Sequence, residues 1–114
     1  MTRGEPERLR DIKDAIAAID RHIERARSTP DGIDDPLLHD ALLFQFIVIG
    51  EAVKNLQETR SQAPEIPWDD IAGLRDLIAH EYFRIQITRI LEIVERDLPP
   101  LARAIDSLLG RSAD

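Results

Sequence analysis

Residues 41–50 read ALLFQFIVIG, and this stretch decides how the chain folds. At about 100° per residue, its apolar side chains cover almost the whole circumference of a helix. They are Leu42, Leu43, Phe44, Phe46, Ile47, Val48 and Ile49. A helix that is apolar all round is buried all round, and a small bundle rarely supplies enough partners within one chain. The stretch therefore predicts that part of this helix contacts a second copy of the chain, in a homodimer.

Turn-forming residues bracket this helix. The segment STPDGIDDP, residues 28–36, predicts a loop. Pro36 after Asp35 predicts the start of the helix, with Asp35 as its cap. The helix is expected to run to about Arg60, before the proline-punctuated loop SQAPEIPW, residues 61–68. The most apolar run is far shorter than the roughly 20 residues that a membrane span requires, so no membrane span is expected.

Apolar residues outside this helix recur at steps of three and four, which is typical of amphipathic helices. A first helix carries Leu9, Ile12, Ile16, Ile19 and Ile23; a third carries Ile71, Leu74 and Ile78; a fourth carries Ile87, Ile90, Leu91 and Val94. Asp69 or Asp70 is expected to cap the third helix. Pro99 and Pro100 are expected to break or restart the fourth helix, before a short last helix over 101–109. The pattern predicts one all-α domain over 1–114, an antiparallel bundle of four to five helices.

Composition narrows the possible chemistry. The chain has no cysteine, which excludes disulfides and thiolate catalysis. Its first residues are polar, so no signal peptide is visible and a cytoplasmic location is expected. The formal net charge of -7 opposes long-range attraction to nucleic acid. Any contact with RNA therefore requires a local basic patch, which two chains can build together.

One segment, GLRDLIAHEYFRI at 73–85, gathers groups that can do chemistry. Arg75 offers a fixed positive fork for a phosphate, and His80 can move a proton near neutral pH. Asp76 and His80 are four residues apart, so Asp76 is expected to accept a hydrogen bond from the His80 ring. Arg75 and His80 diverge by roughly 140° around the helix. They converge only if Arg75 bends across, the helix deforms, or a second copy supplies a facing pair.

This pair suits cleavage of RNA by its own 2′-hydroxyl, which needs no metal, no cofactor and no protein nucleophile. One group takes the hydroxyl proton and the other stabilises charge on the phosphorus. The alternative is that Arg75–Asp76 and His80–Glu81 are ordinary surface ion pairs. Other charged residues carry less chemical signal. Glu51 and Lys54 follow the apolar core of the second helix and could line a polar pocket, but their sequence favours a helix-surface salt bridge. His22 and His39 suggest surface or cap positions.

Four segments give the chain a wider resemblance. They are IGEAVKNL at 49–56, PEIPWDDIAGLRDLIAHEYF at 64–83, RDLIAHEY at 75–82 within it, and ERDLPPL at 95–101. RDLIAHEY resembles the Arg-x4-His-x-Tyr signature of HepT-like toxins of the HEPN superfamily. The other segments resemble parts of the same family, in the same order over nearly the whole chain.

The resemblance implies a helical homodimer whose two motifs face a shared cleft. It implies a metal-independent ribonuclease in a toxin–antitoxin pair, with Arg75 and His80 as catalytic residues. Asp76 stands where the family most often has asparagine, and it places negative charge beside the phosphate site. The implied partner is a small MNT-type nucleotidyltransferase antitoxin that silences the toxin by transferring AMP to Tyr82.

A second interpretation belongs to a different functional class. The chain would then be a non-catalytic helical partner, or a nucleotide-binding subunit, of a small nucleotidyltransferase. The arginine–histidine pair favours a ribonuclease, whereas the acidic charge and Asp76 favour the second interpretation.

Overall fold

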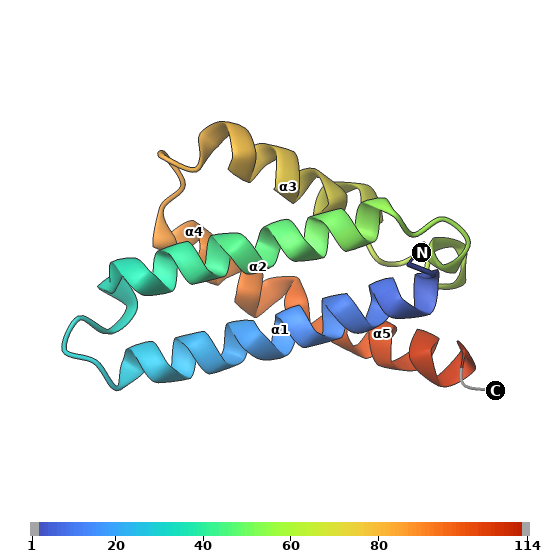
Figure 1. Ribbon diagram of the computed structural model, residues 1–114, viewed down its shortest axis with the longest axis horizontal. Helices are drawn as coiled ribbons and strands as arrows, with labels where there is room; N and C mark the ends of the chain where they lie inside the picture. The colour runs from blue at the N-terminus through green and yellow to red at the C-terminus, as the bar shows by residue number, and fades with distance from the viewer. Residues whose placement is uncertain (1–2, 113–114) are drawn as a thin grey trace.

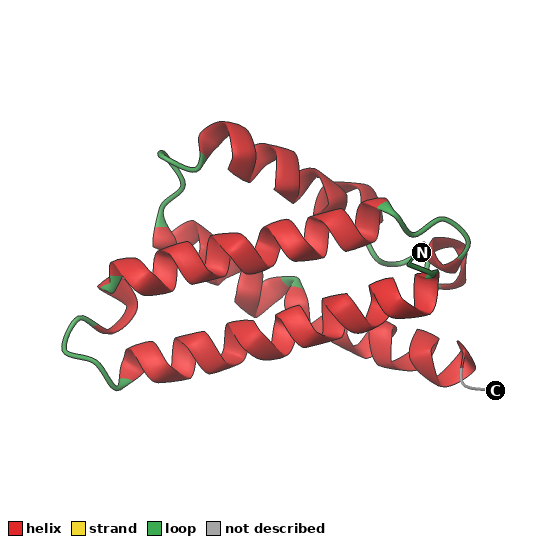
Figure 2. Cartoon of the chain, in the orientation of Figure 1, coloured by secondary structure: helices red, strands yellow, loops and turns green. Residues whose placement is uncertain are grey.

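The computed structural model describes residues 3–112, which form five α-helices joined by short connections (Figure 1, Figure 2). The helices are α1 (Glu5–Arg27), α2 (Pro36–Lys54), α3 (Trp68–Glu81), α4 (Ile87–Arg96) and α5 (Leu98–Ser112), with 3₁₀ helices η1 (Gly32–Asp34) and η2 (Thr59–Gln62) in the connections. No strand occurs within residues 3–112, so the predicted all-α class is confirmed. Helix α2 lies between α1 and α3, which run antiparallel to it, and α5 packs on α1 (Figure 1).

Helix α1 buries the apolar stripe that the sequence predicts. Leu9, Ile12 and Ile19 are fully buried, and the stripe faces α2 and α5. Acidic residues occupy the first turn and arginines the last turn, which suits the helix dipole at both ends.

The start of α2 also follows the prediction. Gly32 adopts a positive φ of 56° in the turn before it, a conformation that glycine takes without steric cost. The Asp35 side chain then accepts a hydrogen bond from the backbone N–H of Leu37 at 2.9 Å. Pro36 follows at the first helical position, where a missing N–H costs nothing.

Most of the apolar surface of α2 is buried within the chain itself. Leu42, Phe46 and Ile49 are at most 1% exposed, because α1 covers one side of α2 and α3 covers another. The expectation that the bundle lacks partners for this helix was therefore wrong for these residues. Phe44 differs, since it is 61% exposed and contributes an apolar surface that the chain leaves uncovered.

By length and composition, α2 is also the one described helix that could cross a membrane. Its mean hydropathy is 1.4 over a window of 18 residues, which is longer than the run at 41–50. Of its most apolar window, 44% is buried inside the structure, and the core helix of a soluble protein meets the same criterion. The length of α2 is therefore weak support for a membrane span.

Helix α2 ends at Lys54, not at about Arg60 as predicted. The chain turns there because Glu5, at the start of α1, captures the backbone that follows. Its carboxylate accepts hydrogen bonds from the backbone N–H groups of Gln57, Glu58 and Thr59 at 3.1–3.2 Å, and from the Thr59 hydroxyl at 2.7 Å. Burial alone raises the pKa of Glu5, but these hydrogen bonds together outweigh it, so the pKa lies below its ordinary value of 4.5.

Helices α3 and α5 begin two or three residues earlier than predicted. Helix α3 starts at Trp68, and its first turn contains Asp69 and Asp70, neither of which makes a capping hydrogen bond. The predicted aspartate cap was therefore wrong, although both charges suit the helix N-terminus. The predicted break after α4 falls at Asp97, and α5 begins at Leu98 with both prolines in its first turn, where proline is tolerated.

Candidate active site

Helix α3 carries the arginine–histidine segment and lies unusually close to α2. Ile71 and Ile78 anchor α3 in the core. Gly50 of α2 sits directly beneath Arg75, since a Cβ added to Gly50 would be 3.0 Å from both the backbone nitrogen and the Cβ of Arg75. It would also be 3.3 Å from the carbonyl oxygen of Ala72. The absence of a side chain at residue 50 therefore sets the height of Arg75 above α2.

Two carboxylates contact the Arg75 guanidinium. Its Nε lies 2.9 Å from Oε2 of Glu51, and its Nη1 donates a hydrogen bond to Oδ1 of Asp76 at 3.2 Å. The Glu51 oxygen is covered from solvent, yet the N–H direction does not meet hydrogen-bonding geometry. We therefore describe Arg75–Glu51 as an ion pair between helices, held by charge and proximity.

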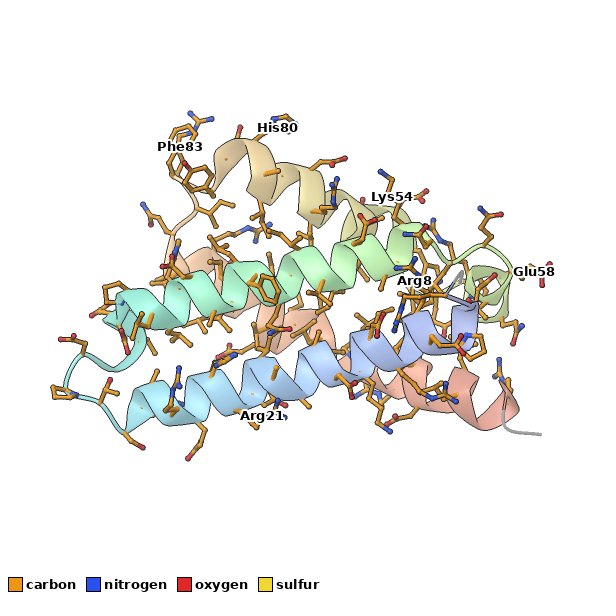
Figure 3. All side chains as sticks on the ribbon, viewed as in Figure 1. Arg8, Arg21, Lys54, Glu58, His80 and Phe83 are labelled. Carbon is orange, nitrogen blue, oxygen red and sulfur yellow. The ribbon has the colours of Figure 1, made fainter. Side chains whose placement is uncertain are left out.

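His80 behaves differently from Arg75. Its side chain is exposed and points away from α2 (Figure 3). Within residues 3–112 it makes no hydrogen bond or ion pair. The predicted hydrogen bond from His80 to Asp76 is not formed, because Asp76 turns to Arg75 instead. A His80–Glu81 pair is also absent, since Glu81 accepts a hydrogen bond from Arg84 at 3.0 Å.

Arg75 and His80 therefore remain apart in a single chain. Helix α3 is continuous from Trp68 to Glu81, so the divergence expected from helix geometry persists. Arg75 lies over α2, whereas His80 faces solvent. Of the three ways in which they could converge, the bent arginine and the deformed helix are not observed.

Tyr82 follows the last residue of α3 and is 61% exposed. Its ring packs edge-to-face on Phe83, with the centroids 5.9 Å apart, and the Arg84 guanidinium lies 5.7 Å from the Phe83 ring.

His39 holds the end of the connection between α3 and α4, because its Nε2 lies 2.8 Å from the carbonyl oxygen of Ile85 and must donate to it. His39 is thus a tether between α2 and the α3–α4 connection, and the surface or cap role expected for it was wrong.

Two hollows of the chain lie beside the arginine–histidine segment without including Arg75 or His80. Two adjoining grooves of about 370 Å³ each run along α3 and α4 and share Phe46, Leu74, Arg89 and Ile93 in their walls. Neither Arg75 nor His80 lines them. The arginine–histidine segment occupies an open helix surface, which a long polymer can reach more easily than an enclosed cavity permits.

Comparison of the sequence with known proteins shows which family the chain belongs to. The profile described as "Ribonuclease HepT-like" matches residues 12–108, which include all of α2, α3 and α4. The chain belongs to the HepT-like ribonuclease family. The family resemblance read from the sequence is therefore confirmed, and RNA is the substrate class that the family name implies.

Curated relatives of this HepT-like chain bear similar names. A "Putative RNase" of Caldanaerobacter subterraneus subsp. tengcongensis is 39% identical over 92 residues, covering 78% of this chain and 82% of the relative. A "Gamma-glutamylcyclotransferase and putative RNase" of Methanocaldococcus jannaschii is 32% identical over 98 residues, covering 85% of this chain and 44% of that relative. A "Probable ribonuclease HepT" of Thermococcus cleftensis is 31% identical over 109 residues, covering 95% and 98%. No solved structure matches the chain.

Sequence reasoning missed the neighbours of the HepT-like motif on α2. Glu51 pairs with Arg75 on the neighbouring helix. The expected salt bridge between Glu51 and Lys54 is not formed, and Lys54 has no ion pair within residues 3–112. Gly50 offered a signal, because a glycine inside an apolar helix often marks close backbone approach. The pairing of Glu51 with Arg75 had no such signal, since it depends on how α2 and α3 are placed.

Proposed function

We propose that this chain is the toxin of a toxin–antitoxin pair and cleaves RNA without a metal ion, in a cleft formed by two copies of the chain. The divergence of Arg75 and His80 on α3 carries this proposal. A phosphate bound at Arg75 lies on a different face from the His80 ring of the same chain. A second α3 facing the first supplies the missing group to each half of the cleft.

Exposed apolar side chains support the pairing of two copies through α2 and α3. Five of the six large exposed apolar residues within 3–112 lie on these helices or directly after α3, and Ile33 is the sixth. The five are Leu37, Phe44, Leu77, Tyr82 and Phe83. Apolar area of this kind, on the elements that carry the motif, favours burial against another subunit. Two copies also bring two Arg75 guanidinium groups into one cleft, each beside the carboxylates of Glu51 and Asp76.

The proposed reaction needs only the RNA and these side chains. A neutral His80 takes the proton from a ribose 2′-hydroxyl, and the 2′-oxygen attacks the adjacent phosphorus. Arg75 binds the phosphate oxygens as their negative charge rises. The bond to the 5′-oxygen breaks as the second His80 of the cleft, in its protonated form, donates a proton to that oxygen. The products are a 2′,3′-cyclic phosphate and a 5′-hydroxyl.

Incubation of the purified protein with RNA in a chelator tests the activity. We expect cleavage in the chelator and cyclic phosphate ends, and we expect Arg75→Ala and His80→Ala to abolish cleavage while the circular dichroism spectrum is retained. Arg21→Ala and His22→Ala are matched controls on α1; Figure 3 shows Arg21 on the side of the molecule opposite His80. Cleavage that persists in both motif variants would exclude these residues, and loss of wild-type cleavage in the chelator would exclude the metal-independent mechanism.

The oligomeric state tests the shared cleft. Phe44→Glu places a charge on the exposed apolar surface of α2 and is expected to give folded monomers in sedimentation experiments. Ala17→Glu adds the same charge to an exposed position of α1 and should leave a dimer. A wild-type monomer at micromolar concentration would contradict the shared cleft.

The exposure of Tyr82 supports silencing by a nucleotidyltransferase antitoxin. AMP attached to its hydroxyl would bring a phosphate and a nucleotide into the cleft, where the phosphate can pair with Arg75 and exclude RNA. Mass spectrometry of the chain co-expressed with its partner should find AMP on Tyr82, and Tyr82→Phe should escape silencing. AMP found only on another residue would remove Tyr82 from this mechanism.

One observation favours the alternative, a non-catalytic partner or nucleotide-binding subunit of the nucleotidyltransferase. Arg75 already contacts two carboxylates, which compete with any phosphate. The same RNA incubation decides between the two functions, because the alternative predicts tight binding to the nucleotidyltransferase and no cleavage by the wild-type chain.

A further inference from the structure

The two carboxylates on Arg75 differ in origin and in exposure. Glu51 belongs to α2, and its side chain is 46% exposed, although the oxygen that faces Arg75 is covered from solvent. Asp76 is the next residue on α3, and its side chain is 66% exposed. Helices α2 and α3 approach closely at Gly50. This approach places Glu51, the next residue of α2, beside Arg75. Glu51 therefore reaches Arg75 from a second helix through a covered oxygen, whereas Asp76 is more exposed and can turn away into water.

They also engage different nitrogens of the guanidinium. The closest contact of Glu51 is with Nε and that of Asp76 is with Nη1, while Nη2 makes no hydrogen bond within residues 3–112. A phosphate binds an arginine best through two parallel N–H groups on one edge. The Nη1–Nη2 edge becomes available when Asp76 leaves, and Glu51 can stay on Nε throughout.

We propose that Glu51 is a positioning residue that orients Arg75 for the scissile phosphate, and that Asp76 competes with this phosphate for the same guanidinium. The proposal rests on the ribonuclease function above and assigns opposite roles to two carboxylates on one arginine. Removing Glu51 frees Arg75 to turn, whereas removing Asp76 opens the edge that the phosphate uses. The first loss harms cleavage and the second favours RNA binding.

Three glutamine or asparagine variants separate these roles from a simple change of charge. Glu51→Gln, Asp76→Asn and the control Glu58→Gln each remove one negative charge. Glu58 lies at the far end of the molecule from His80 (Figure 3), and its side chain makes no hydrogen bond or ion pair within residues 3–112. An effect of net charge alone would move RNA binding in the same direction in all three variants.

We expect steady-state kinetics on a short RNA to split the variants. Glu51→Gln should lower kcat roughly 10- to 100-fold with a smaller change in KM, because a misplaced group costs rate more than binding. Asp76→Asn should lower KM about 2- to 5-fold, as expected for removing an exposed competing ion pair. Glu58→Gln should match the wild type. Glu51→Asp keeps the carboxylate and should recover part of the lost kcat.

Two results would overturn the proposal. One is a Glu51→Gln variant that behaves like Asp76→Asn or like Glu58→Gln. The other comes from NMR relaxation of the Arg75 Nε–H group, which reports its order without any catalysis. We expect this group to become more mobile in Glu51→Gln and to stay ordered in Asp76→Asn; unchanged order in Glu51→Gln contradicts positioning. If the wild type cleaves no RNA, the ribonuclease proposal fails separately and the NMR result still decides the role of Glu51.

Discussion

Replacing Gly50 by alanine tests how closely α2 and α3 must approach at the motif. The new methyl group would lie 3.0 Å from the backbone nitrogen of Arg75 and 3.3 Å from the carbonyl oxygen of Ala72. Neither backbone atom can rotate away, as the end of a side chain could. Contacts between carbon atoms are optimal at about 3.5–4.0 Å, so α3 has to move outward by a few tenths of an ångström.

The free energy of unfolding should fall as a result. Overpacking of this kind costs about 1–3 kcal/mol, and replacing glycine inside a helix offsets roughly 0.5–1 kcal/mol of that loss. We expect a net destabilisation of roughly 1 kcal/mol, seen as a lower urea midpoint at unchanged slope and fixed protein concentration. The rate of RNA cleavage should fall by up to about 100-fold, because Arg75 moves with α3.

Two other glycines provide controls. A Cβ added at Gly73 in α3 or at Gly110 in α5 meets no atom within 4 Å. Gly73→Ala should therefore stabilise the fold by up to about 1 kcal/mol, and Gly110→Ala should leave cleavage unchanged. If Gly50→Ala stabilises the protein as much as Gly73→Ala does, the close approach of α2 and α3 is not a constraint, and the reasoning fails.

Three further predictions concern the fold around this site. Phe46→Ala should cost about 3–5 kcal/mol because Phe46 is fully buried, whereas Phe44→Ala should change the stability of the single chain by less than about 0.5 kcal/mol in urea unfolding. Glu5→Gln should destabilise the protein at neutral pH, because the lowered pKa of Glu5 means that its contribution is complete above the ordinary value of 4.5 and is lost as the pH falls through the folded value; urea midpoints of the wild type and the variant should converge at low pH. His39→Ala should cost roughly 1 kcal/mol and speed amide hydrogen exchange at 82–86, since it removes the bond to the Ile85 carbonyl.

The helices were predictable where one local pattern decided them. Asp35 and Pro36 specify the start of α2 through their own side chains, and periodic apolar residues gave α1 its buried stripe. The end of α2 was not predictable in this way. The segment after Lys54 leaves the helix where Glu5, some fifty residues earlier, binds its backbone N–H groups. A contact between distant residues overrode local helix propensity there.

The candidate site also has a part that local sequence predicts and a part that depends on how the helices pack. Arg75, His80 and Tyr82 were found because they share one short segment and carry distinct chemistry. The proximity of Glu51 to Arg75 arises only when α2 and α3 are packed together. The expected hydrogen bond between Asp76 and His80 had the right spacing but failed, because an arginine lies nearer to the same carboxylate. Spacing on a helix states which side chains can meet, and competition among neighbours decides which do.

A chain without the His80 ring should keep the same fold and docking surfaces, because that ring makes no hydrogen bond or ion pair within residues 3–112 and stands in solvent. If the chain forms the dimer proposed above, this variant exchanges into wild-type dimers and gives hybrids with one imidazole per cleft. If each cleavage event needs both imidazole rings, added His80→Ala protein inhibits the wild-type enzyme in proportion to its share of the mixture. If one ring is enough, the hybrids keep working, so a titration of the two proteins counts the imidazoles that a single cleavage event uses.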